Sequence, residues 1–203
     1  MQLATLKDEN NIVIPPEFYD PAPGPFTVIR ISDVPIKTTL CELVKTPERF
    51  NGKMLTVRGN ILIGFENFQL DLSDCRGGAI ENIWLEYGKG PKRQPTIWCC
   101  GDIAPRDSLR LDMNRDFQAF HRYVTAQKKG EGCHEGECHL YDVTTTLTGR
   151  FDLRPTVTCR DGKSKCPKDG GFGHLGIFVA RFVIQSVSDV TAKPIDPSVY
   201  ERK

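Results

Sequence analysis

The sequence predicts a mainly β protein: a five-stranded Greek-key barrel with a short N-terminal helix, a helix between strands three and four, and a long insertion. Three observations predict it. Five segments have the pattern of strands, a helix-start signal precedes the first, and apolar residues recur at helical spacing between the third and fourth. The 203 residues suffice for one domain with a hydrophobic core.

We predict three regions along the chain: an N-terminal extension at 1–37, the barrel domain at 38–190 and a tail at 191–203. The extension is rich in proline, which favours extended chain, and only Phe26–Ile31 has the pattern of a short strand. The barrel is therefore expected to begin near residue 38.

The first helix is predicted from about Leu40 to Lys45. Thr39 and Glu42 have the spacing of a capping box, in which each side chain satisfies a free amide at the helix start. Pro47 is expected to end the helix, because the residue before a proline disfavours helical geometry.

Period-two alternation predicts the strands. The first spans 55–63, where Gly59 marks a bulge or bend that lets the strand curl. The others are expected at 67–72, 83–87, 141–153 (with Gly149 at its middle) and 177–187, the last apolar on both faces as in a covered strand. An insertion at about 88–110 includes a possible strand at 96–100.

The second helix is predicted from apolar residues at helical spacing, namely Met113, Phe117, Phe120 and Val124. Lys128-Lys129-Gly130 then has the composition of a cationic last turn followed by a glycine stop. This helix would separate strands three and four.

This order of elements resembles the oligonucleotide/oligosaccharide-binding (OB) fold over about 39–190. The resemblance is strongest in two segments, Asn51–Gly59 and Leu147–Phe151. The chain is also similar to uncharacterised bacterial exported OB-like proteins, in the pattern Gly-Lys-x-x-x-Val-x-Gly at 52–59 and in the segment Ile-Trp-Leu-Glu-Tyr-Gly at 83–88. That resemblance implies a fold and no particular activity.

The charge balance disfavours nucleic acid as a partner. Lys and Arg number 27 against 26 Asp and Glu, so the chain has no strong overall field. No run approaches the ~18 apolar residues that a membrane-spanning helix needs. Residues 1–10 show no secretory signal, but eight cysteines favour an extracytoplasmic protein whose signal peptide is absent from this chain.

A segment rich in cysteine and histidine, residues 133–139, suggests a zinc site. We expect it to be a flexible loop leading into strand four, because glycines surround it. An all-thiolate site would use Cys133, Cys138, Cys159 and Cys166, with His134 and His139 as possible substitutes. The gaps of four and six residues within the cysteine pairs are unlike the usual zinc knuckle, which disfavours this interpretation.

Disulfides are the alternative that we prefer for these cysteines. A Cys41–Cys75 bridge would pin the first helix over the barrel, and a Cys159–Cys166 bridge would close a polar loop. The adjacent Cys99 and Cys100 would point to opposite faces of a strand. We predict at least two disulfides.

A ligand groove of the OB type would use aromatic and basic side chains for stacking and charge: Arg58, Phe65, Trp84 and Lys163, together with Phe172 and His174 in the glycine-rich segment 170–176. Trp84, Arg58 and the segment 170–176 each have a structural alternative. Trp84 would pack beneath the insertion, Arg58 would pair with Glu86 across the sheet, and 170–176 would be a long mobile turn.

The function predicted is a non-enzymatic binding or interaction module for an unidentified protein, oligosaccharide or other ligand. The usual hydrolase, metalloprotease and phosphate-loop motifs do not occur in the sequence. The alternatives are a zinc protein, structural or hydrolytic with Glu135 or Glu137 as general base, and a single-stranded nucleic-acid binder. No cofactor other than possible zinc is expected.

Overall fold

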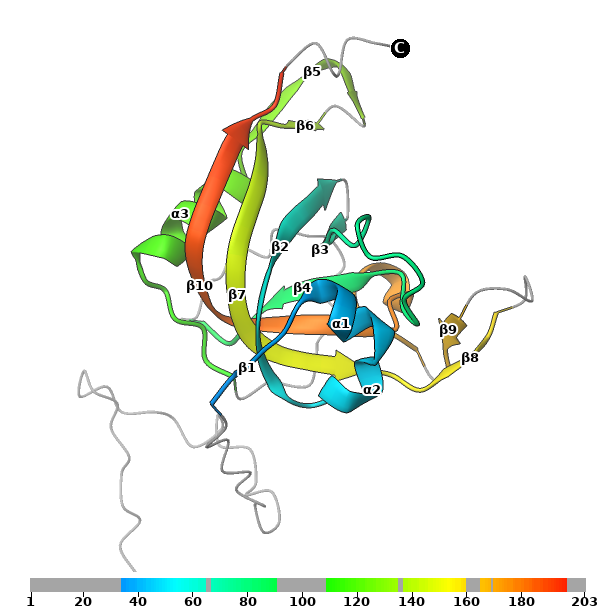
Figure 1. The fold of residues 1–203 in the computed structure, drawn as a ribbon. Coiled ribbons are helices and arrows are strands. Elements are labelled where there is room, and N and C mark those ends of the chain that lie inside the picture. The colour runs from blue at the N-terminus through cyan, green and yellow to red at the C-terminus, as the bar shows by residue number, and fades with distance from the viewer. Residues whose placement is uncertain are drawn as a thin grey trace, which may run out of the picture. The chain divides into compact units, whose positions relative to one another are not determined.

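A computed structural model describes residues 34–64, 67–90, 109–134, 137–159, 165–168 and 170–196 (Figure 1). The helices are α1 (Leu40–Lys45), α2 (Pro47–Phe50) and α3 (Arg115–Val124), and a 3₁₀ turn spans His174–Gly176. The strands are β1 (Ile36–Lys37), β2 (Met54–Gly64), β3 (Asn67–Leu70), β4 (Ile83–Tyr87), β5 (Gln127–His134), β6 (Glu137–His139), β7 (Tyr141–Leu153), β8 (Thr156–Thr158), β9 (Lys165–Pro167) and β10 (Ala180–Pro194).

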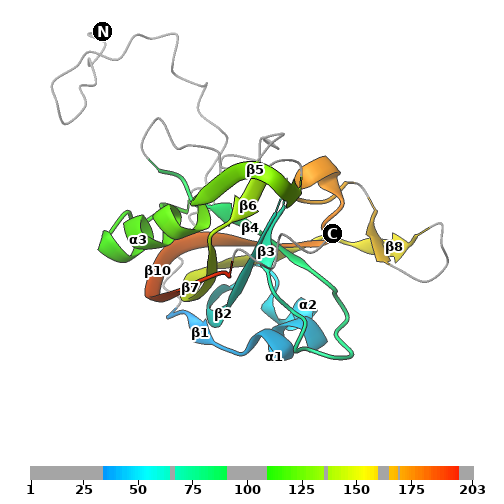
Figure 2. The same ribbon diagram turned by 90° about the horizontal axis from the view of Figure 1, so that it is seen from above.

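Five strands form a closed barrel, as predicted. Their order is β2-β3-β4-β10-β7, and β7 pairs again with β2 (Figure 2). The β4–β10 pair is parallel and the other four are antiparallel. β2 closes the barrel because its first part, 54–61, pairs with β7 and its last part, 61–64, pairs with β3.

Two mid-strand glycines permit close approach inside the barrel. A Cβ at Gly149 of β7 would lie 2.1 Å from the carbonyl oxygen of Val183 on β10. A Cβ at Gly59 of β2 would lie 2.6 Å from Cδ1 of Leu40, so this position leaves room for α1 to pack on the strand. Large side chains that are fully buried fill the interior, among them Phe68, Phe120, Phe151 and Phe182.

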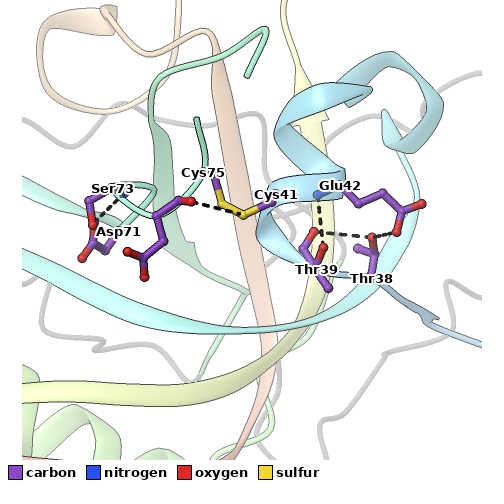
Figure 3. The surroundings of a disulfide bond; sticks show 8 residues. Thr38, Thr39, Cys41, Glu42, Asp71, Ser73 and Cys75 are labelled. Atoms are coloured by element: carbon purple, nitrogen blue, oxygen red, sulfur yellow. Dashed lines mark hydrogen bonds between the residues drawn. A yellow bond between two sulfur atoms is a disulfide. The ribbon is translucent and has the colours of Figure 1, made fainter. Parts of the chain in front are cut away.

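Helix α1 begins and ends where predicted. The Thr39 hydroxyl accepts a hydrogen bond from the amide of Glu42 at 3.1 Å, which caps the helix start (Figure 3). The Cys41–Cys75 disulfide joins α1 to the segment after β3, 34 residues on (Figure 3). Pro47 does end α1, but it also begins α2, which was not predicted, because proline is well suited to the first turn of a helix.

Helix α3 is shorter than predicted. Asn114 caps it, and its buried face consists of Phe117, Phe120 and Val124, but it ends at Val124. Residues 127–134 form β5, which pairs with β6 (137–139). The helix end expected at 128–130 is therefore wrong, and so is the loop expected across 133–139 where β5 and β6 form strands instead. β10 likewise runs to Pro194, past the predicted tail boundary at 191.

Some predicted features lie outside the described residues: the strands at 26–31 and 96–100, Cys99, Cys100, Phe65 and Lys163. Within the described part of the chain, no helix is long and apolar enough to cross a membrane.

Candidate binding surface at the connection between β7 and β10

The outer face of β4 carries Trp84 and Glu86, since neighbouring residues on a strand point to opposite faces. Trp84 is nevertheless only 5% exposed. Its ring lies 4.9 Å from that of Phe178, and a Cβ at Gly173 would lie only 2.4 Å from its Cδ2 atom. Trp84 is therefore packed, but the described contacts come from residues 171–178, called here the loop, and not from the insertion that was expected to cover it; residues 91–108 of that insertion lie outside the described residues.

Backbone hydrogen bonds give the loop a defined shape. The amide of Gly171 donates to the carbonyl of Gly176 at 2.7 Å, and Phe172 and Phe178 exchange bonds of 2.8 and 3.2 Å. Leu175 has a φ of 54°, in the left-handed region that a leucine seldom adopts. The turn leaves Leu175 and Ile177, called here the tip, 76% and 61% exposed.

The base of the loop is fixed by Phe172, which is 5% exposed. The guanidinium carbons of Arg154 and Arg181 lie 4.9 and 4.6 Å from the centre of its ring. Such contacts attract a cation to the negative face of the ring, and more strongly where water is excluded. Phe172 therefore ties the loop to β10 and to the end of β7.

One buried and three partly buried charged side chains form a cluster next to Phe172. Arg181, with a side chain 5% exposed, donates from Nη1 to Oε2 of Glu86 at 2.9 Å and from Nε to Oδ2 of Asp152 at 2.8 Å. Arg150 holds Asp152 with two further bonds of 2.7 Å each. Two cations thus oppose two carboxylates, and the four groups have no net charge.

The environment of Asp152 acts on its pKa in two directions. Burial by itself raises the pKa of this carboxyl, but the hydrogen bonds and positive charges of Arg150 and Arg181 outweigh it and lower the pKa below the usual value. The carboxylate form is therefore the one that the folded protein stabilises.

The structure brings only some of the predicted ligand residues together. Trp84 lies against Gly173 and Phe178 of the loop that also contains Phe172 and His174, whereas Arg58 lies apart on β2. The guanidinium of Arg58 donates to Oγ1 of Thr146 at 3.3 Å and to the carbonyl of Asp189 at 3.1 Å. Its predicted pairing with Glu86 is wrong, because β4 lies between β3 and β10 in the barrel and not beside β2, and β10 supplies Arg181 as the partner of Glu86.

Sequence reasoning missed Arg181, although a signal was present. It stands in an apolar run, Ala180-Arg181-Phe182-Val183, of a strand predicted to be covered on both faces. A charged residue in such a place requires a partner, and a carboxylate on a neighbouring strand was the partner to seek. The alternation of apolar and polar residues in the sequence gave no sign that Leu175 and Ile177 would be exposed.

Both disulfides considered from the sequence occur in the structure. Cys159–Cys166 closes the β8–β9 hairpin, and Cys41–Cys75 ties α1 to the barrel. Cys138 is also disulfide-bonded. Thiolate is the form that binds zinc, so a site using Cys138, Cys159 and Cys166 requires these bonds to be reduced. Among the described residues, no group of three or more His, Cys, Asp and Glu is arranged to hold a metal ion.

The connection from β7 to β10, residues 154–179, is basic. It contains five Lys and Arg and two Asp, an excess of three positive charges in a chain whose net charge is +1. Arg154, Lys165 and Lys168 are exposed, and none of them forms an ion pair with a described residue. Comparisons with protein-family models, curated proteins and solved structures give no match for this chain.

Proposed function

We propose that the protein is a non-enzymatic binding module with an OB-like barrel. The strand order and the helix α3 between the third and fourth barrel strands support this proposal, since the OB fold has this arrangement. The disulfides support a place in an oxidising, extracytoplasmic compartment, where such bonds persist.

We further propose that the contact surface is the tip rather than an open aromatic groove. The observation that carries this is the contrast within one loop: Phe172 is 5% exposed, whereas Leu175 and Ile177 are 76% and 61% exposed. A loop with a fixed base and exposed apolar side chains can bind without a large loss of conformational freedom. A mobile loop would have to become ordered first.

Nucleic-acid binding and zinc binding stay alternative hypotheses. Stacking of bases needs accessible aromatic faces, and Trp84 and Phe172 are both covered. Single-stranded binding predicts affinity that falls steeply with salt. A zinc protein predicts about one equivalent of metal in protein that was prepared without chelator.

Site-specific photo-crosslinking tests the proposed surface. Ile177 is replaced by benzoyl-phenylalanine, and the matched control carries the same residue at Leu62 of β2, another exposed apolar position (41%). Both variants are irradiated in an extract of the cells that make the protein. We expect a crosslinked product, with either a protein or a lipid, at 177 and none at 62. Equal crosslinking at both positions, or none at 177, contradicts the proposal.

A further inference from the structure

Basic residues lie in the segment that leads into the loop. Gly171 at the start of the loop is so close to Pro167 of β9 that a Cβ there would lie 2.6 Å from the proline Cγ. Lys168 follows this proline, and its amide donates to the carbonyl of Pro155 at 2.9 Å. Lys168 therefore stands between Pro167 and the start of the loop, and Lys165 begins the short strand that Pro167 ends.

Arg154 adds a third cation at the base of the loop. Its amide donates to the carbonyl of Val179 at 2.8 Å and its guanidinium lies over Phe172. The described residues of the connection, 154–159, 165–168 and 170–179, include no Asp or Glu. Among the described residues of this connection, the Asp, Glu, Lys and Arg side chains are therefore all basic.

We propose that this surface binds an anionic lipid bilayer, with Leu175 and Ile177 inserted among the acyl chains and Arg154, Lys165 and Lys168 at the headgroups. This inference rests on the proposed function and names its partner. Two apolar side chains alone bind a membrane weakly, and a basic patch adds attraction to acidic lipids. The combination found here is the one that such reversible binding requires.

The chemistry favours a bilayer over nucleic acid. The exposed side chains at the tip are aliphatic, and aliphatic groups gain by leaving water but offer no face for base stacking. The aromatic rings that would stack, Trp84 and Phe172, are each only 5% exposed. The near-zero charge of the whole chain is compatible with this, because surface attraction falls off within about a Debye length and depends on the local patch.

Vesicle sedimentation tests the inference with the full chain. Vesicles of phosphatidylcholine alone are compared with vesicles containing about one third phosphatidylglycerol. We expect binding to the mixed vesicles only, with Leu175→Ser/Ile177→Ser lowering the partition coefficient about tenfold or more. Leu62→Ser, which removes one exposed apolar side chain (41%) away from the tip, is the control and should have no effect.

A second pair of variants separates local charge from net charge. Lys165→Gln/Lys168→Gln should weaken binding about 30-fold, from about fivefold for each lysine near the surface. Lys45→Gln/Lys53→Gln removes the same charge at exposed positions elsewhere and should weaken binding far less. Equal losses from the two pairs would overturn the proposed orientation, and a tip variant that binds normally would overturn insertion.

The lipid inference and the proposed surface can fail separately. No binding to mixed vesicles, together with a protein crosslinked at 177, overturns the lipid inference and leaves the tip as a protein-binding surface. Failure of both experiments overturns both. Circular dichroism and thermal unfolding of each variant verify that the substitutions at these exposed positions leave the fold intact.

Discussion

Gly173→Ala should destabilise the protein substantially more than Gly170→Ala, although the two glycines stand in one loop region. Both have positive φ, 66° and 85°, so both variants bear a backbone penalty of about 1–2 kcal/mol. Only Gly173 touches another side chain: a Cβ would lie 2.4 to 2.8 Å from three atoms of the Trp84 ring, whereas a Cβ at Gly170 meets nothing within 4 Å. Overpacking of a buried site adds about 1–3 kcal/mol, which is the difference expected between the variants.

Urea denaturation followed by circular dichroism measures both free energies of unfolding. A double-mutant cycle sharpens the test, because Trp84→Ala removes Cγ, Cδ2 and Cε3, the three atoms that the new methyl group would meet. In that background we expect Gly173→Ala to cost no more than Gly170→Ala does. If the two glycine variants differ by less than about 0.5 kcal/mol in the unaltered protein, Trp84 does not lie against Gly173 and the closed loop is wrong.

Two further outcomes follow from the charges and the disulfides. The folded pKa of Asp152 lies below the ordinary 3.8, so its carboxylate stabilises the folded protein above that pH, and this stabilisation is lost as the pH falls through the folded pKa. Asp152→Asn should therefore make the free energy of unfolding, measured by urea denaturation below pH 3.8, fall less steeply with decreasing pH. An unchanged pH dependence in the variant would refute this prediction. Replacing both cysteines by serine should cost about 4 kcal/mol for Cys41–Cys75, whose partners are 34 residues apart, and about 2.5 kcal/mol for Cys159–Cys166, 7 apart; the reverse order in chemical denaturation would contradict loop entropy as the main cause.

The barrel was predictable because its signals are local. The hydroxyl of Thr39 caps α1 at the predicted residue, and alternation over 141–153 gives β7 with both bounds correct. The end of α3 was not predictable in the same way. After Val124, the hydroxyl of Thr125 bonds to the carbonyl of His121 at 2.7 Å, and the lysines that follow join a hairpin instead of a last helical turn. Pairing with a strand further along the chain decided the outcome there.

The candidate surface was less predictable than the barrel, because side-chain alternation does not say what will cover an outer face. Trp84 was correctly placed on β4, but its cover comes from residues about ninety positions later. From the sequence, Gly171, Gly173 and Gly176 indicate a long mobile turn at 170–176. In the structure two of them allow contacts that a Cβ would forbid, and Gly173 and Gly176 adopt positive φ.

The covered aromatic pair also determines which mode of binding is favourable. A ligand that stacked on Trp84 and Phe172 would first have to displace the loop. Displacement exposes both of these side chains to water, at about 1.5–3 kcal/mol each, and separates Phe172 from the guanidiniums of Arg154 and Arg181. That cost lowers the apparent affinity by at least about 100-fold. A ligand that contacts Leu175 and Ile177 meets no such cost, because these side chains are already exposed in the closed loop. Trp84→Ala should therefore weaken binding at the tip indirectly, by releasing the loop, and Gly173→Ala should reproduce the loss while the aromatic ring is retained.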